Sequence, residues 1–356
     1  MSDPKTTARR FAVEEGRRFL GRAFAAAGLP EADAGAVAEA MLFADLRGVD
    51  SHGVVRLPGY LKRLKAGGIN SRPRIRIVQE APATALVDGD NGMGHLVMRH
   101  AARIAVEKAT QCGVAWVGTR GSNHAGAASC YAMMPLARDM IGLYLAVANN
   151  NHMAAWGGIE PLLGTNPIAI AVPALEEPPV VLDIATTAIS FGRIRNAADA
   201  GEKLPEGLVM DYSGNPVTDP EQASHGLLLP IGAYKGFGLS LMFSLMGGVL
   251  NGTATGRDTV SLENDAAAGN TGQAIMALKL ENFGPVEAFK RRVDKVARDI
   301  RTSKPMPGVS EVRYPGLNGH RTETERRKSG IPIRAAFAAA LDKLATELGI
   351  APLALM

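Results

Sequence analysis

The sequence predicts an α/β fold, and three observations support that class. Short apolar runs alternate with helical patterns between residues 75 and 301, as in a sheet covered by helices. Helical patterns over residues 5–47 and 333–348 flank this alternation from both chain ends. The chain has 356 residues, 46% of them hydrophobic, which favours two or three domains and is ample for a sizeable core.

The first part of the chain is predicted to be helical. Residues 5–47 carry apolar side chains near helical spacing, and Gly28-Leu29-Pro30 divides them into two helices. The second helix should end near Gly48, a residue suited to a helix C-cap. A short helix over residues 57–64 is expected next, before Gly67-Gly68 stops it.

The central part is predicted to alternate between strands and helices. Strands are expected over residues 75–78, 83–88, 114–118, 141–148, 168–172, 180–183 and 274–280. Helices are expected over residues 98–112, 131–138 and 286–301, and over the strongly apolar residues 239–250, which should be buried. Loops are expected over the turn-rich residues 205–220 and the Pro/Gly-rich residues 304–319.

Composition excludes several classes of protein. The net charge is +4, and the short basic runs 290–292 and 326–328 are typical of solvated helix faces, so no nucleic-acid partner is expected. Cys112 and Cys130 form neither a metal motif nor a disulfide framework, which favours a reducing compartment. We see no signal peptide and no apolar run long enough for a bilayer, and therefore expect a cytoplasmic protein with no membrane partner.

The segment from Gly48 to Tyr60 combines residues that apolar packing does not explain. His52 can move a proton near neutral pH, since a free imidazole titrates at about 6.5. Ser51 can hydrogen-bond that imidazole, and Arg56 can hold a carboxylate through two parallel N–H bonds. The segment therefore predicts acid/base chemistry beside a small anion.

Two glycine-rich stretches resemble the nucleotide-binding turn of a Rossmann fold but are incomplete. Residues 86–94 lie between a predicted strand and a predicted helix, yet the third glycine position holds Val97. Gly236-Phe237-Gly238 likewise has Leu241 at that position. Because the third glycine allows the close strand–helix approach, ordinary tight turns explain both stretches better. A nicotinamide cofactor would need another mode of binding.

Four further constellations have both a functional and a structural interpretation. In Gly121–Gly126, small residues and helix-start amides suit a polar ligand, although its histidine could be a satisfied loop residue. Asp183 ends an apolar strand, where it could act in a site or cap a helix. Lys235 lies among glycines and needs an anion or solvent. Trp156-Gly157-Gly158 and Gly164-Thr165-Asn166-Pro167 are typical of ordinary turns.

A metal site is not expected. The candidate ligands are His52, His124, His152 and Asp183. No two of them lie at a short ligand spacing such as His-x-x-His, and no glutamate accompanies a histidine in a hydrolase-like motif.

Together these segments resemble the type 2 malate/L-lactate dehydrogenase family, which includes ureidoglycolate dehydrogenase, sulfolactate dehydrogenase and Δ1-piperideine-2-carboxylate reductase. The resemblance spans nearly the whole chain, from Ala44 to Gly316. The motifs that carry it occur in the family's order: Asp50-Ser51-His52-Gly53-Val54-Val55-Arg56-Leu57-Pro58, Ser122-Asn123-His124, Gly164-Thr165-Asn166-Pro167, Asp183-Ile184-Ala185-Thr186 and Tyr234-Lys235-Gly236-Phe237-Gly238.

The resemblance implies an oxidoreductase that uses NAD or NADP on a mixed-sheet domain that is not of Rossmann type. It implies a helical dimerisation domain from residues 1–77 and 284–356 and a cofactor-binding domain from 78–120 and 225–283. An inserted α/β domain over residues 121–224 would bind substrate and cofactor. The implied partners are a small carboxylate substrate and a second copy of the chain in a homodimer.

The resemblance also implies roles for individual residues. His52 would give and take the proton, with Ser51 and Asp183 orienting it, although part of the family assigns that role to the residue equivalent to His124. The residues implied to hold the substrate carboxylate are Arg56 and Thr165. Those implied to line the cofactor are His124, Ala125, Gly126, Ala127, Ala128, Asn149, Ile184, Ala185, Thr186 and Lys235.

Three functions stay open at this point. The first is interconversion of a small 2-hydroxy acid and its 2-keto acid, of the malate/lactate type, with His52 as the acid/base. The second is NADPH-dependent reduction of a cyclic imino acid, and a remote third is a metal-dependent hydrolase or lyase. Ala125 stands where the family usually has a bulky residue, which reshapes the pocket and leaves the substrate open.

Overall fold

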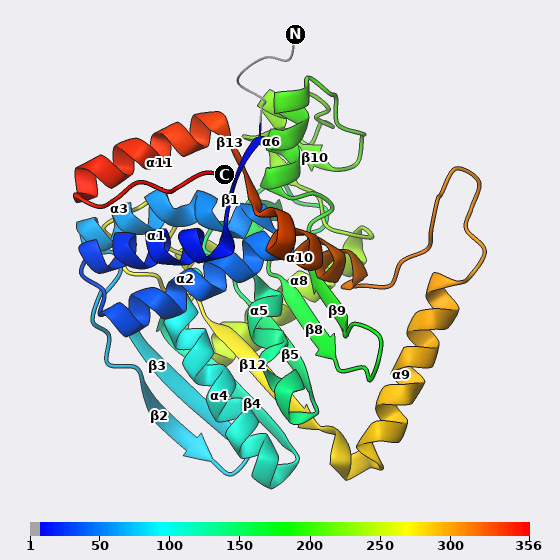
Figure 1. The fold of residues 1–356 in the computed structure, drawn as a ribbon. Helices are drawn as coiled ribbons and strands as arrows, with labels where there is room; N and C mark the ends of the chain where they lie inside the picture. The colour runs from blue at the N-terminus through cyan, green and yellow to red at the C-terminus, as the bar shows by residue number, and fades with distance from the viewer. Residues whose placement is uncertain (1–7) are drawn as a thin grey trace.

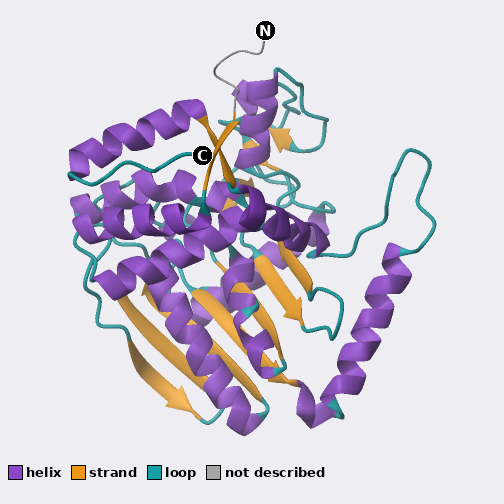
Figure 2. Ribbon diagram, in the orientation of Figure 1, coloured by secondary structure: helices purple, strands orange, loops and turns teal. Residues whose placement is uncertain are grey.

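Seven strands form the central sheet of the protein in a computed structural model, which describes residues 8–356 (Figure 1, Figure 2). In sheet order they are β2 (Arg76–Ala81), β3 (Thr84–Gly92), β4 (Val114–Ser122), β12 (Gln273–Lys279), β5 (Met140–Ala146), β8 (Ile168–Val172) and β9 (Val180–Ile184). Within this sheet only β3 and β4 run parallel, and the other neighbouring pairs are antiparallel. A doubly wound nucleotide-binding fold is built around parallel strands, so this mixed sheet has a different construction.

Helices cover this sheet and extend beyond it. The helices that the structure describes are α1 (Val13–Ala26), α2 (Glu31–Leu46), α3 (Leu57–Ala66), α4 (Gly94–Cys112), α5 (Ala128–Ala132), α6 (Phe191–Ala200), α7 (Pro220–Ala223), α8 (Tyr234–Gly247), α9 (Val286–Arg301), α10 (Leu317–Ser329) and α11 (Ala335–Leu348). Helix α4 packs across β3, β4 and β12, while α5 lies over β5, β8 and β9 (Figure 1). The α/β class with a mixed sheet is confirmed.

Residues 8–356 also form three small two-stranded sheets. They are β1 (Ala8–Phe11) with β13 (Ile331–Arg334), β6 (Met153–Ala154) with β7 (Pro161–Leu163), and β10 (Val209–Met210) with β11 (Leu227–Leu228). The pair β1 and β13 joins the two ends of the described chain. The other two pairs lie in the part of the chain between β5 and α8.

The two ends of the chain share one hydrophobic core. In the pair β1–β13, Phe11 lies opposite Ile331. Phe19 of α1, Met41 of α2 and Leu341 of α11 are fully buried in the same cluster. Figure 1 shows α11 in red beside α1 and α3 in blue. Burial of these apolar side chains therefore ties the chain ends together.

The predicted elements are largely confirmed, and one error has a simple cause. The strand over residues 168–172 and the helix over 286–301 have the predicted bounds. The helix predicted over residues 131–138 is wrong, because α5 ends at Ala132 and a 3₁₀ turn follows over Met134–Arg138. Pro135 lacks the amide hydrogen that a helix interior requires.

Two further differences involve the chain ends. Helix α10 begins at Leu317, inside the predicted loop 304–319, and Leu317 is its only buried residue, so no apolar periodicity marks it. The helix predicted from residue 5 begins at Val13, because residues 8–11 pair as β1, and residues 5–7 lie outside the described residues.

Helix α8 exposes an apolar face, contrary to the prediction that this helix would be buried. The side chains on that face are between 37% and 67% exposed. They are Leu239, Leu241, Met242, Leu245, Met246, Val249 and Leu250, the last two from the turn after the helix. Contiguous exposed apolar side chains are typical of an interaction surface.

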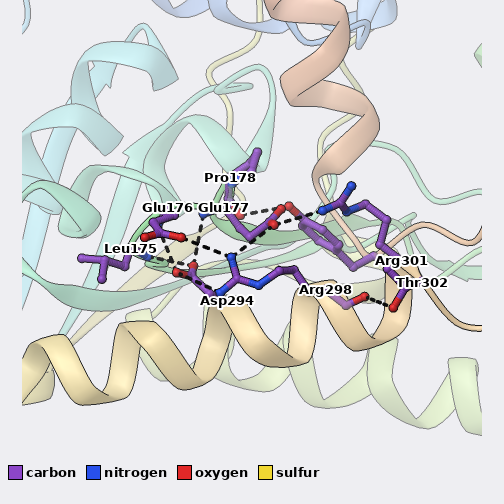
Figure 3. Close-up of polar contacts among 9 residues, drawn as sticks. Leu175, Glu176, Glu177, Pro178, Asp294, Arg298, Arg301 and Thr302 are labelled. Carbon is purple, nitrogen blue, oxygen red and sulfur yellow. Dashed lines mark hydrogen bonds and ion pairs between the residues drawn. The ribbon is translucent and has the colours of Figure 1, made fainter.

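Helix α9 is attached to the connection between β8 and β9 by one buried carboxylate (Figure 3). The side chain of Asp294 is 1% exposed and accepts hydrogen bonds from the amides of Leu175, Glu176 and Glu177 at 3.0, 3.1 and 3.2 Å. Burial raises the pKa of Asp294, but the amide donors and Arg298 outweigh it, so the pKa lies below the usual range. The carboxylate therefore stays charged and holds three amides at once.

Removal of this carboxylate should destabilise the fold. Asp294→Ala leaves three amides without their acceptor, and we expect a loss of about 1–3 kcal/mol in the free energy of unfolding. Urea denaturation measures the loss. Asp299→Ala is the matched control, because Asp299 lies on the same helix and pairs with Lys295 at an exposed position. Equal losses in the two variants would contradict the role given to Asp294.

Candidate functional site

One end of the central sheet gathers the segments that the sequence singles out. Strand register aligns Thr119 of β4 with Gln273 of β12 and Ala146 of β5. It likewise aligns the start of β8, at Ile168, with the end of β9, at Ile184. The residues that follow β4, β5 and β9 therefore meet at one edge, together with those that precede β8.

Hydrogen bonds confirm that these segments touch. The amide of Thr186 and its Oγ1 both donate to the carbonyl of Thr165, at 2.9 and 3.0 Å. The amide of Ile231 donates to the carbonyl of Thr186 at 2.9 Å, which brings the start of α8 and Lys235 to the same edge. The substrate-binding and cofactor-binding candidates of three distant segments are thus neighbours.

The loop that carries His52 consists of two short 3₁₀ turns between α2 and α3. Asp45 of α2 holds this loop, because the amide of Val54 donates to Asp45 Oδ2 at 2.8 Å. A Cβ atom at Gly53 would lie 1.8 Å from Asp45 Oδ1, so only glycine fits there. The glycine of the Ser-His-Gly motif is therefore required for close packing beneath the histidine.

Asp45 is a buried acid that stays protonated near neutral pH. Its side chain is 2% exposed, and burial raises its pKa to about 8, against the opposing effect of the Val54 amide. Between the usual carboxylate pKa and this raised value, the folded chain binds a proton that the unfolded chain has lost. The free energy of unfolding therefore falls as pH rises through that window.

Asp45→Asn should abolish this pH dependence. From pH 5 to pH 7 we expect the stability of the variant to gain about 2–3 kcal/mol relative to the unmodified chain. Urea denaturation of both proteins at several pH values gives the difference directly. Parallel stability curves over that range would show that the Asp45 carboxyl is already ionised.

Ser51, His52 and Arg56 form a compact group. Ser51 Oγ lies 2.9 Å from His52 Nδ1, and Arg56 Nε donates to the Ser51 carbonyl at 2.7 Å. Within residues 8–356 Arg56 forms no ion pair, so the two Nη groups of this exposed side chain are available for an anion. Burial and the Arg56 charge lower the pKa of His52 to about 4, which keeps the imidazole neutral at pH 7.

His124 lies beside His52, with the ring centroids 5.4 Å apart and the planes within 20°. Tyr60 Oη lies 2.6 Å from His124 Nδ1. His95 packs edge-on against Tyr60 at 5.3 Å, and neither of its ring nitrogens has a hydrogen-bond partner among the described residues. Burial lowers the pKa of His95 to about 3 and that of His124 well below its usual value. The cluster therefore contains three neutral imidazoles.

Sequence reasoning missed Tyr60, His95 and Arg63. The side chain of Arg63 is buried and donates to the Asn123 side chain at 3.2 Å and to the carbonyl of Ala267 at 2.8 Å. It thereby fixes the residue that precedes His124. Arg56, Tyr60 and Arg63 are spaced four and three apart, so helical periodicity could have placed all three on one face.

Asp183 lies at the same sheet edge but not on the imidazole. Its Oδ2 accepts the amide of Ser129 at 2.9 Å, and among the described residues no hydrogen bond joins it to Ser51 or His52. Burial raises the pKa of Asp183, while Ser129 and Arg47 oppose this. The structure therefore brings together Ser51, His52 and Arg56, while Asp183 of β9 is hydrogen-bonded to the start of helix α5.

The residues predicted to line a cofactor have suitable chemistry. Ile184, at the end of β9, is 37% exposed and offers an apolar surface. Lys235 is exposed in the first turn of α8 and forms no ion pair within residues 8–356. An apolar surface suits a nicotinamide ring, and an ammonium without an ion-pair partner suits a phosphate. These two residues therefore fit a nicotinamide cofactor.

Two other predicted cofactor residues, Ala125 and Asn149, form hydrogen bonds within the protein. The carbonyl of Ala125 accepts the Tyr131 hydroxyl at 2.5 Å. Asn149 is 5% exposed and donates to Thr271 Oγ1 at 2.8 Å. Ala125, Gly126 and Ala127 form the turn between His124 and α5, in which Gly126 adopts a φ of 74°, and Ala128 is the first residue of that helix.

Residues 8–356 contain no cluster of three His, Cys, Asp or Glu side chains arranged to hold a metal ion. The helices described here also include none with the length and apolar character needed to cross a bilayer.

Comparison with known proteins decides the family. The family model for malate/L-lactate dehydrogenase matches residues 11–342. The chain belongs to this family. It is therefore a dehydrogenase, of the 2-hydroxy acid type represented by malate and sulfolactate dehydrogenases. The alternative of a metal-dependent hydrolase or lyase is wrong, because family membership makes the protein an oxidoreductase.

Relatives of this dehydrogenase share most of its length. A malate dehydrogenase of Pyrococcus horikoshii is 36% identical over 342 residues, covering 93% of both chains. An L-sulfolactate dehydrogenase of Methanocaldococcus jannaschii is 39% identical over 324 residues, covering 91% of this chain and 92% of the relative. A solved structure of a sulfolactate dehydrogenase from that organism has a TM-score of 0.88 and covers 96% of this chain and 98% of its own.

One solved structure comes from a reductase. The Δ1-piperideine-2-carboxylate reductase of Pseudomonas syringae has a TM-score of 0.83 at 28% identity, and the match covers 95% of this chain and all of that one. The dehydrogenase described here is therefore similar both to enzymes named for 2-hydroxy acids and to one named for a cyclic imine.

Proposed function

We propose that this dehydrogenase interconverts a small 2-hydroxy acid and its 2-keto acid with NAD or NADP, and that His52 is the acid/base. The arrangement of Ser51, His52 and Arg56 carries the proposal. A neutral imidazole stands beside an unpaired guanidinium, which is the pair of groups needed to take a hydroxyl proton next to a carboxylate. Lys235, Ile184–Thr186 and the turn after His124 would hold the cofactor.

Each residue has a defined part in this chemistry. The bound nicotinamide supplies or accepts the hydride. Arg56 Nη atoms hold the substrate carboxylate, with help from Thr165, and His52 takes the hydroxyl proton in the direction of oxidation. Because the Arg56 charge lowers the pKa of His52, a carboxylate bound to Arg56 raises that pKa and favours proton uptake. Ser51 is a positioning residue on the imidazole, and Asp183 would act at one remove, by holding the start of helix α5 through the Ser129 amide.

A turnover assay tests the reaction class. Malate, lactate, sulfolactate and ureidoglycolate are offered with NAD and with NADP, and Δ1-piperideine-2-carboxylate is offered with each reduced cofactor. We expect oxidation of at least one hydroxy acid. Turnover of the cyclic imine alone would favour reductase activity instead. Two observations support that alternative: the small Ala125 side chain and the structural similarity to a piperideine-2-carboxylate reductase.

We also propose that the exposed apolar face of α8 is covered by a second copy of the chain in a homodimer. Light scattering should then give twice the mass of one chain. Met242→Glu combined with Leu245→Glu places two charges on side chains that are 50% and 40% exposed, and should yield monomers. If the unmodified protein has the mass of a single chain in light scattering, the proposal is wrong.

A further inference from the structure

The hydrogen bonds around His124 fix which of its ring nitrogens carries hydrogen. The amide nitrogen of Gly126 lies 3.3 Å from His124 Nδ1 and meets the geometric requirements of a donor. An amide can only donate, so Nδ1 must accept with its lone pair and carries no hydrogen. A neutral ring then holds its hydrogen on Nε2. A protonated ring, with hydrogen on both nitrogens, does not fit this contact.

Tyr60 provides a second and shorter hydrogen bond to the same atom. Its Oη lies 2.6 Å from His124 Nδ1, and its side chain is 5% exposed. Burial raises the pKa of Tyr60, so the phenol keeps its hydrogen. Because Nδ1 carries no hydrogen, that phenolic hydrogen must be the one shared with it. Two donors therefore converge on one nitrogen.

The surroundings of His124 also oppose a positive charge. The titratable and charged groups that act on it are Arg56, His52 and His95, and none of them is an anion. Burial is the largest cause of the lowered pKa of His124, since little solvent stabilises an imidazolium at this depth, and these groups add to it. Geometry and charge thus favour the same neutral tautomer.

We propose that Tyr60 is a positioning residue which, with the Gly126 amide, holds His124 as the neutral Nε2–H tautomer, so that His124 donates a hydrogen bond to the reacting oxygen of the substrate. This role rests on the proposed function. In oxidation, the C2–H electron pair leaves as hydride to the nicotinamide, the hydroxyl proton passes to His52, and the carbon–oxygen double bond forms. His124 keeps its hydrogen throughout, and the choice between the two histidines falls on His52.

Nitrogen NMR of the full chain, labelled with ¹⁵N in its seven histidines, tests the tautomer without any need for turnover. The signals of His124 are identified by their loss in His124→Asn. We expect Nδ1 without hydrogen and Nε2 with hydrogen throughout pH 6–8. A ring with hydrogen on Nδ1, or one that gains a proton in this range, would overturn the assignment.

Tyr60→Phe tests the positioning residue itself. Only the longer Gly126 contact then holds Nδ1, so we expect a measurable share of the Nδ1–H tautomer to appear and kcat to fall about 2–10-fold, as for the loss of one neutral hydrogen bond. Tyr314→Phe is the matched control, because Tyr314 is also buried and its hydroxyl donates to the Pro178 carbonyl at 3.3 Å, away from the histidines.

The outcomes separate the two proposals. An unchanged His124 tautomer in Tyr60→Phe, with kcat equal to that of Tyr314→Phe, overturns the part given to Tyr60. A chain that shows the Nε2–H tautomer but oxidises none of the hydroxy acids overturns the proposed reaction and leaves the tautomer standing.

Discussion

His52→Ala is expected to lower kcat for hydroxy-acid oxidation by about 10²–10⁴-fold, which is the usual contribution of a positioned general acid or base. Arg56 is held to Ser51, and the His52 imidazole is the base that contacts the same residue directly. Its pKa of about 4 in the free protein keeps it neutral and able to accept a proton over the ordinary assay range. The loss should therefore appear in kcat and persist from pH 6 to pH 9.

Steady-state kinetics of three variants show whether His52 or His124 is the acid/base. His100→Ala serves as the control, because His100 lies on α4 outside the cluster and should leave kcat unchanged. His124→Asn removes the imidazole with its Nε2–H donor and should cost less than His52→Ala. Near-normal turnover in His52→Ala, with a large loss in His124→Asn, would transfer the acid/base role to His124.

Arg56→Lys is expected to raise KM for the acid substrate about 10–100-fold with a smaller change in kcat. Arg56 uses Nε on the Ser51 carbonyl and keeps its Nη groups for the substrate, a division that a single ammonium cannot reproduce. Loss of a charge-assisted hydrogen bond accounts for about 1.5–3 kcal/mol of binding. Initial-rate measurements over a wide substrate range give both constants.

Substitutions at Arg56 also test its effect on the pKa of His52. A lysine keeps the positive charge near His52, so the pH dependence of kcat/KM should change little, whereas Arg56→Gln should raise the pKa of His52 in the free protein. Arg74→Lys, at an exposed position before β2, is the matched control for the charge. An unchanged KM in Arg56→Lys would rule out Arg56 as the carboxylate clamp.

Local sequence patterns predicted most of the elements but not those stabilised by distant partners. The sheet strands and α9 have strong apolar patterns, and both were predicted. Strand β1 depends on β13, more than 300 residues away, and helix α10 has almost no apolar face. Periodicity contains no information about either. The domain boundaries at residues 77, 120, 224 and 283 stay predictions.

The candidate site follows the same rule. Ser51, His52 and Arg56 lie within six residues of one another, and their chemistry was evident from the sequence. Tyr60 became interpretable only once the fold placed it on His124, which is 64 residues away. Asp183 was expected to help orient the imidazole, and the structure shows its carboxylate accepting the Ser129 amide. Reactive side chains can be identified in the sequence, but which of them lie close together depends on the strand register.

The shared core of the chain ends has a consequence for synthesis. Val54 and Tyr60 belong to the same buried cluster as Ile331, Leu341 and Leu353. A ribosome must therefore add nearly 300 further residues after Tyr60 before the last members of this cluster exist. Until then the core into which Val54 and Tyr60 pack is incomplete, so the segment that carries His52 reaches its final packing only late in synthesis.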